Sequence, residues 1–151
     1  MIKKSINIIS FVLLSLLIIS CEKTNQSEID RGIIEAYVLD NNLEGQFTST
    51  GLYYVITEEG NSDHPTINST VNVDYRGYKL NGIVFDENDH LEYGLSGFIQ
   101  GWVEGLQLIG EGGKIKLIIP SGLAYGQSGS GSIGPNEVLA FDITLNYFFN
   151  K

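Results

Sequence analysis

Aromatic residues that stand next to glycines and to acidic side chains are the residues of this 151-residue chain best suited to act together. Aromatic side chains can line a water-poor pocket for an apolar group, and a carboxylate among them would supply an oriented charge. The same residue types also build ordinary cores, so their spacing has to decide. They occur in five short strings, Tyr75-Arg76-Gly77, Phe85-Asp86, Gly101-Trp102, Tyr125-Gly126 and Phe141-Asp142.

In order and spacing, these strings resemble the FK506-binding-protein (FKBP) family of peptidyl-prolyl cis/trans isomerases. The matching segments are Val71-x-Val73-x-Tyr75-x-Gly77, Asn81-Gly82-x-x-Phe85-Asp86, Phe98-Ile99-x-Gly101-Trp102-x-Glu104-Gly105-Leu106, Ile119-Pro120-x-x-Leu123-Ala124-Tyr125-Gly126 and Leu139-x-Phe141-Asp142. The resemblance implies an enzyme that isomerises X-Pro peptide bonds. Its partners would be X-Pro-containing polypeptides and macrolide inhibitors, and it would need no cofactor or metal.

The resemblance also implies a role for each matched residue. Trp102 would be the floor under the proline ring, between walls made by Tyr75 and Phe141. The Tyr75 hydroxyl would hold Asp86, and Tyr125 would donate a hydrogen bond to a substrate carbonyl. The expected catalytic residues are Tyr75, Phe85, Asp86, Trp102, Tyr125 and Phe141, and the expected substrate-binding residues are Phe98, Ile99 and Ile133.

Three departures from the family pattern fall at the rim and flap of this pocket, one of them the short stretch from Glu87 to Leu91, which lacks the arginine that some members place near the aspartate. Phe98 stands where many members have valine, and Gly134-Pro135 replaces the usual Pro-Pro in the flap, residues 129–135. These changes leave substrate preference and macrolide affinity open, whereas the pocket floor is complete. The alternative function is a non-catalytic proline-binding chaperone or scaffold lipoprotein with the same fold.

Other kinds of site lack the context that they require. Residues 129–134 match the dinucleotide pattern G-x-G-x-x-G, but Pro135 and a strand follow where a helix should begin. Neither a P-loop string nor a G-x-S-x-G string is present. His64 and His90, both expected in loops, have no partner at ligand spacing, and the acidic residues among 86–89 lack a calcium-loop pattern.

These residues have to be positioned by an α+β fold, in which an antiparallel twisted β-sheet wraps around one short α-helix. Val71, Val73 and Tyr75 alternate with polar residues, which predicts a half-buried strand. Further strands are expected over residues 52–57, 83–85, 91–95, 114–119 and 138–148, with Leu139, Phe141, Ile143, Leu145 and Tyr147 on a single face of the last. The short helix is predicted over residues 98–109.

A second short helix is predicted ahead of the sheet. Apolar residues recur at helical spacing from Ile29 to Val38, and the helix should end near Asn41. Its apolar face would pack on the domain or, alternatively, pair with a second copy in a homodimer.

The first twenty residues have the pattern of a secretory signal peptide. Lys3 and Lys4 precede an apolar stretch, Ile6 to Ile19, that is too short to span a bilayer. The string Ile18-Ile19-Ser20-Cys21 resembles the bacterial lipobox, which implies that Cys21 is acylated and becomes the new N-terminus. A free cysteine is the alternative.

The chain thus divides into a signal peptide (1–20), a lipidated tether with a short helix (21–50) and an isomerase domain (51–151). Its formal net charge is −9, and loss of Lys3 and Lys4 with the signal leaves 7 basic against 18 acidic residues, or −11. This charge argues against nucleic acid as a partner. We expect an extracytoplasmic protein, anchored through Cys21 on the periplasmic side or at the cell surface, that assists the folding of exported proteins.

Overall fold

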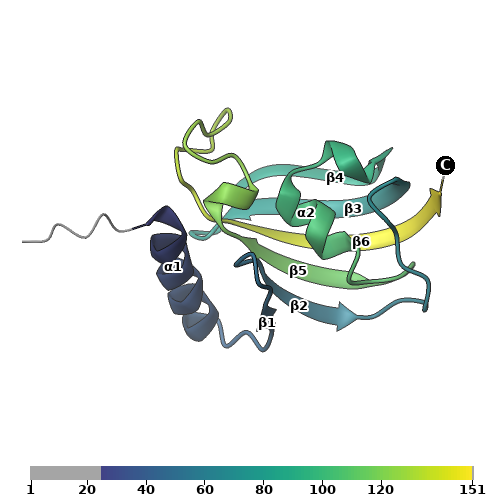
Figure 1. Cartoon of the computed structure of the whole chain (residues 1–151), viewed down its shortest axis with the longest axis horizontal. Coiled ribbons are helices and arrows are strands. Elements are labelled where there is room, and N and C mark those ends of the chain that lie inside the picture. Colours follow the sequence, from purple (N-terminus) through teal and green to yellow (C-terminus); the bar gives the residue numbers. More distant parts are fainter. Residues whose placement is uncertain (1–24, 151) are drawn as a thin grey trace, which may run out of the picture.

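A six-stranded antiparallel sheet with one short helix across its face forms the centre of the computed structural model, which describes residues 25–150 (Figure 1). The strand order is β1-β2-β5-β6-β3-β4. The elements are α1 (Gln26–Asp40), β1 (Gln46–Phe47), β2 (Tyr53–Glu58), β3 (Ser69–Lys79), β4 (Val84–Gly94), the 3₁₀ turn η1 (Leu95–Gly97), α2 (Gln100–Leu106), β5 (Lys114–Ile119), the 3₁₀ turn η2 (Ser121–Leu123) and β6 (Leu139–Asn150). This is the expected α+β arrangement. The predicted signal peptide and Cys21 lie outside the described residues.

Helix α2 is shorter than the predicted helix over residues 98–109. Its N-cap is Ile99, whose backbone is extended (φ −60°, ψ 151°), and it is only 7 residues long. Ile109 is buried, as the apolar pattern requires, but the helix ends at Leu106 and does not include it. A Cβ atom at Gly101 would lie 2.5 Å from Cγ2 of Ile119, so the glycine allows α2 to lie directly on β5.

Two groups of buried side chains lie on opposite faces of the sheet, as the alternation of strand residues requires. The main core, beneath α2, contains Leu52, Val71, Val73, Leu95, Trp102, Leu106, Ile109, Ile115, Leu117, Ile119, Ile133, Leu139, Phe141, Ile143 and Leu145. The smaller core lies under α1 and contains Ile34, Tyr53, Ile118, Val138 and Ala140. No helix within residues 25–150 is both long enough and apolar enough to cross a membrane.

Helix α1 packs on the domain, as one of the two alternatives expected. Asn25 caps it, because its side chain accepts a hydrogen bond from the backbone of the first turn. Ile34 is fully buried, whereas Ile29 and Ile33 are each 41% exposed. Pairing with a second copy through these exposed residues stays a prediction.

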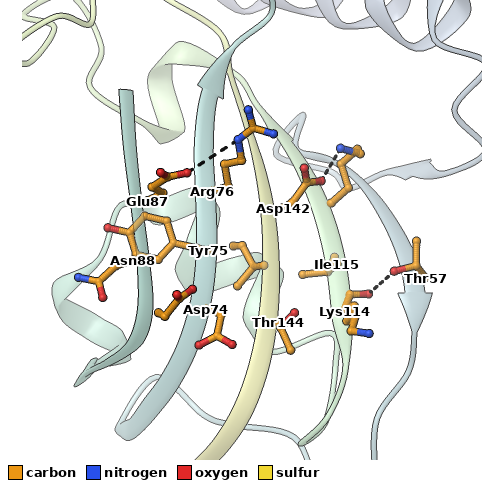
Figure 2. A pocket seen from close by; sticks show the side chains of 13 residues that line it. Thr57, Asp74, Tyr75, Arg76, Glu87, Asn88, Lys114, Ile115, Asp142 and Thr144 are labelled. Carbon is orange, nitrogen blue, oxygen red and sulfur yellow. Dashed lines mark hydrogen bonds and ion pairs between the residues drawn. The ribbon is translucent and has the colours of Figure 1, made fainter. Parts of the chain in front are cut away.

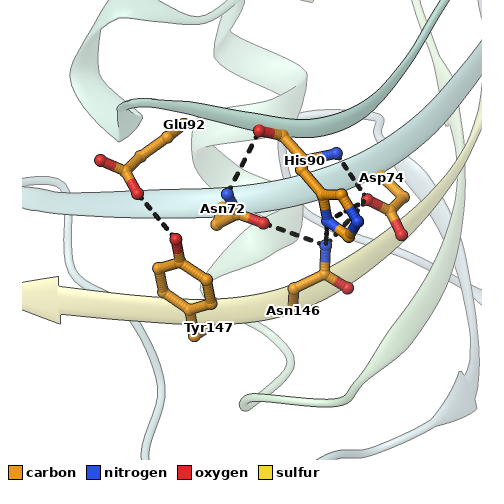
Figure 3. Close-up of polar contacts among 6 residues, drawn as sticks. All are labelled: Asn72, Asp74, His90, Glu92, Asn146 and Tyr147. Atoms are coloured by element: carbon orange, nitrogen blue, oxygen red, sulfur yellow. Dashed lines mark hydrogen bonds and ion pairs between the residues drawn. The ribbon is translucent and has the colours of Figure 1, made fainter.

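A single edge strand, β4, replaces the two short strands and the loop expected over residues 83–95. His90 lies within it at a positive φ of 59°, and its backbone N–H donates to the Asp74 carboxylate at 2.7 Å (Figure 3). The Asn146 side chain donates to the same oxygen at 2.8 Å. The bond from His90 foremost, and then that from Asn146, hold the pKa of Asp74 below its ordinary value. The expectation of a loop was wrong because most β4 side chains are exposed and show no alternation.

The last strand, β6, changes face near its end. A β-bulge where it pairs with Asn72 shifts the register, so that Leu145 is buried while Tyr147 is 43% exposed. The Tyr147 hydroxyl donates to Glu92 at 2.8 Å (Figure 3). Phe148 packs against the main core instead. The expectation that Tyr147 shares the buried face was therefore wrong, because a bulge is invisible in the alternation of residue types.

Candidate active site

Most of the expected site residues line one cavity of about 260 Å³. The lining residues are Tyr75, Asp86, Gly97, Phe98, Ile99, Trp102, Tyr125 and Phe141. They come from β3, β4, β6, the start of α2 and the loop after η2, so segments far apart in the sequence meet here. The cavity lies on the face of the sheet that α2 covers.

Trp102 forms the floor of this cavity and is only 3% exposed. Its ring meets Tyr75 edge-on at a centroid distance of 4.9 Å and Phe141 at 5.3 Å. Phe98 lies 4.8 Å from it at a tilt of 35°. The Trp102 Nε1–H is the one buried side-chain polar atom in residues 25–150 without a hydrogen-bond partner. A buried donor without a partner costs free energy and is rare in native structures.

Asp86 and two tyrosines form the polar edge of the cavity. The Tyr75 hydroxyl donates to Asp86 Oδ2 at 2.7 Å. Burial first, and then the hydrogen bond to Asp86, raise the pKa of Tyr75 far above its ordinary value. Burial and the charge of Asp86 also raise the pKa of Tyr125. Both hydroxyls therefore remain protonated donors at any physiological pH, beside an otherwise apolar cavity.

Gly77 on β3 allows the wall of the cavity to form. A Cβ atom there would lie 2.6 Å from Cε1 of Phe141 and 2.8 Å from Cζ of Phe85. With glycine at this position, the two phenylalanine rings pack edge-on, 5.5 Å apart. The β3–β4 pairing shifts register between Gly77 and Tyr78, where Phe85 is the extra residue and Asp86 pairs with Gly77. This bulge places Asp86 at the cavity.

Two expected residues lie away from the cavity, a third is outside the described residues, and one lining residue was not expected. Phe85 is partly buried, packs edge-on against Phe141 and does not line the cavity. Ile133 is 7% exposed and packs into the main core. Cys21 lies outside the described residues. Gly97 also lines the cavity, and a Cβ atom there would lie 2.3 Å from Cε1 of Tyr93. No spacing signal in the sequence distinguishes it from a turn glycine.

A larger hollow of about 850 Å³ lies on the opposite face of the sheet (Figure 2). Most of its lining residues are polar or charged, and two ion pairs lie among them. Arg76 approaches Glu87 at 4.0 Å, and Lys116 forms an ion pair with Asp142. No group of three or more His, Cys, Asp or Glu residues that could hold a metal ion occurs in residues 25–150. The smaller aromatic cavity is therefore the better candidate site for an apolar ligand.

Comparisons with known proteins agree with this architecture. The family model of the FKBP-type peptidyl-prolyl cis-trans isomerases matches residues 61–146. The isomerase FkpA of Escherichia coli (strain K12) is 45% identical over 102 residues, which are 65% of this chain and 38% of that protein. The probable FkpA of Neisseria meningitidis serogroup B is 41% identical over 118 residues, or 74% of this chain and 43% of the relative.

Solved structures show the same fold. The crystal structure of FkpA from Escherichia coli superimposes with a TM-score of 0.72 at 38% identity and covers 83% of this chain and 63% of that one. A peptidyl-prolyl cis-trans isomerase from Pseudomonas syringae gives 0.71 at 27% identity, covering 83% and 96%.

The fold is thus the FKBP-like α+β fold. The chain belongs to the FKBP-type peptidyl-prolyl cis-trans isomerase family. It spans about two fifths of the length of the curated relatives that it matches.

Proposed function

We propose that this chain is a peptidyl-prolyl cis/trans isomerase that assists the folding of exported proteins. The observation that supports this most is the aromatic cavity, with buried Trp102 beneath it and the hydrogen-bonded pair of Tyr75 and Asp86 at its edge. A cavity of about 260 Å³ has room for a proline ring and its neighbouring peptide groups.

The proposed mechanism is non-covalent. Rotation about a peptide bond must cross a barrier of about 18 to 20 kcal/mol, because resonance gives the C–N bond double-bond character. The twisted amide of the transition state has lost this resonance and is less polar than the planar one. A water-poor aromatic site that grips the ring therefore favours the twisted state selectively. Lowering the barrier by about 5 to 8 kcal/mol would accelerate rotation roughly 10⁴- to 10⁶-fold.

The polar residues would orient the substrate without transferring protons. Tyr125, kept protonated by its raised pKa, would donate to a substrate carbonyl, and the backbone N–H of Ile99 would bind a second one. Asp86 would provide a fixed negative charge near the carbonyl carbon that swings. Phe98 would contact the side chain that precedes proline, where Tyr93 extends the aromatic surface at a ring distance of 5.5 Å.

The proposed setting is extracytoplasmic, with Cys21 acylated and the domain tethered to a bacterial membrane, on the periplasmic side or at the cell surface. The lipobox resemblance supports the anchor. The X-Pro segments of exported chains would be the substrates, because their isomerisation is slow enough to limit folding. Macrolide inhibitors would compete for the same cavity.

A protease-coupled isomerisation assay on the fragment from Thr24 tests the enzyme against a binding-only chaperone or scaffold. We expect the fragment to be active and each of Asp86→Val and Phe85→Ala to reduce kcat/KM by about tenfold or more. Asp86→Val removes the charge at the edge of the cavity, and Phe85→Ala removes the ring that packs edge-on against the lining residue Phe141. Asp86 is exposed, so Asp86→Val should lower the unfolding midpoint only by the loss of the hydrogen bond from Tyr75, and the variant should stay folded. Turnover of the unsubstituted fragment at the uncatalysed rate, together with binding of an X-Pro peptide, would establish the non-catalytic function instead.

A further inference from the structure

A buried carboxylate outside the matched family segment contacts the loop that carries Tyr125. Asp30 lies on α1 and is 1% exposed. Its Oδ2 accepts hydrogen bonds from the backbone N–H of Ser121 at 2.8 Å and from the Ser121 hydroxyl at 2.6 Å. Its Oδ1 accepts from the Gln26 side chain at 2.7 Å. The carboxylate oxygen that contacts the rest of the domain, Oδ2, thus accepts both of its hydrogen bonds from Ser121 in η2.

Ser121 in turn fixes the backbone on both sides of Tyr125. The Ser121 carbonyl accepts hydrogen bonds from the N–H of Ala124 at 3.0 Å and of Gly126 at 2.9 Å. These residues flank Tyr125, whose side chain lines the cavity. A continuous series of hydrogen bonds therefore leads from the N-terminal helix to the two residues on either side of Tyr125.

We infer that Asp30 is a positioning residue, which orients the Tyr125 hydroxyl through Ser121. This inference rests on the proposed isomerase function for its effect on turnover. Two hydrogen bonds from the backbone N–H and the hydroxyl of one residue to a single buried oxygen fix the place and direction of that residue. A small displacement of an orienting group reduces catalysis strongly, because the benefit of orientation depends on geometry.

Attachment of α1 does not rest on this carboxylate alone. Ile34, one turn further along the helix, is fully buried against Tyr53, Ile118 and Ala140 and already holds α1 on the sheet. An apolar residue at position 30 could cover the same surface, but only an acceptor can bind the buried N–H of Ser121. The residue type is therefore explained by the loop that it holds and not by the packing of the helix.

The test is a double-mutant cycle in the full-length chain, solubilised in detergent, assayed where unfolding curves show each variant folded. Asp30→Ala should reduce kcat/KM by about three- to tenfold. Asp30→Asn can keep both bonds to Ser121 and should retain most of the activity. Glu28→Gln removes a charge from an exposed position of the same helix and should change nothing.

The cycle is closed by Tyr125→Phe, which removes only the hydroxyl. In that background Asp30→Ala should reduce kcat/KM by less than about twofold, because the group that Asp30 positions is gone. An equal reduction in both backgrounds would overturn the inference. Where Asp30→Ala fails to fold, Ser121→Ala, which removes one of the two bonds, takes its place in the cycle.

Amide hydrogen exchange separates this inference from the proposed function. Asp30→Ala should accelerate exchange at Ala124 and Gly126, with unchanged exchange in β5 and β6, whether or not the chain turns over. Unchanged exchange at both amides would overturn the positioning role. Absence of turnover in the unsubstituted chain would overturn the isomerase proposal alone.

Discussion

At the scale of single residues, the candidate site combines one buried aromatic floor with a few oriented polar groups. Trp102 contacts three rings, Tyr75, Phe98 and Phe141, at centroid distances of 4.8 to 5.3 Å. Asp86 is exposed but is held by the Tyr75 hydroxyl at 2.7 Å. The arrangement provides an apolar surface and a fixed charge, the two features that the proposed stabilisation of a twisted amide would use.

The pKa shifts of the two tyrosines predict a flat pH profile at alkaline pH. Burial raises the pKa of both Tyr75 and Tyr125 above the ordinary value of 10.0. Their hydroxyls should stay protonated where a free tyrosine begins to ionise, so kcat/KM should be constant from about pH 7 to pH 10. Because the pKa values of both tyrosines are higher in the folded chain than in the unfolded one, their contribution to the free energy of unfolding is complete below about pH 10. This contribution is lost as the pH rises from there through the raised pKa values.

Tyrosinate absorbance and the isomerisation assay, measured over the same pH series, check this expectation. Tyr75→Phe and Tyr125→Phe identify which titration belongs to which residue. The expected flat profile would be contradicted if kcat/KM decreased with a midpoint below pH 10 and if this decrease were absent from one of the two variants.

At the scale of elements, glycines set how closely α2 approaches the sheet. A Cβ at Gly101 would lie 2.5 Å from Cγ2 of Ile119, so Gly101→Ala should push α2 outward and destabilise the fold by about 1 to 3 kcal/mol. Gly32→Ala is the matched control, because nothing lies within 4 Å of its added methyl group in α1. It should stabilise the protein by about 0.5 to 1 kcal/mol.

Urea unfolding of both variants measures these effects. Equal changes of the same sign for the two substitutions would show that packing at Gly101 is not the cause. Because Trp102 adjoins Gly101 in α2, the Gly101→Ala variant should also lose activity, whereas Gly32→Ala should not.

The elements could be predicted from the sequence where residue types alternate or repeat, and not elsewhere. β5 (Lys114–Ile119) has the bounds expected from its apolar run and Pro120. The middle of the edge strand β4 was taken for a loop because its side chains are exposed and show no alternation. Likewise, seven of the nine residues expected at the cavity line it, since their spacing follows a family pattern. Asp30 could not be found, because an acidic residue in a helix normally indicates the solvated face.

At the scale of the whole molecule, α1 is an integral part of the domain. Ile34 is fully buried in the smaller core, so Ile34→Ala should reduce the free energy of unfolding by about 2 to 5 kcal/mol. Ile33 is 41% exposed, and Ile33→Ala should change it by less than about 1 kcal/mol. Equal and small effects, measured by denaturant unfolding, would show that α1 is not held by this contact.

Membrane attachment of the whole protein is proposed to depend on one side chain. Cys21→Ser removes the thiol that would carry the lipid, so the protein should be released into the soluble fraction or remain as an uncleaved precursor. Fractionation of cells that express either form measures this. An unchanged membrane fraction with normal processing would contradict the lipid anchor.

The central claim is that the aromatic cavity catalyses rotation about X-Pro bonds, and exchange NMR of a short X-Pro peptide tests it without a coupling protease. Catalytic amounts of the fragment from Thr24 should produce cis/trans exchange peaks within milliseconds to seconds, whereas uncatalysed exchange takes tens of seconds or longer. Trp102→Ala should abolish this acceleration while Glu28→Gln keeps it. Exchange at the uncatalysed rate with the unsubstituted, folded fragment, or full acceleration by Trp102→Ala, would contradict the account.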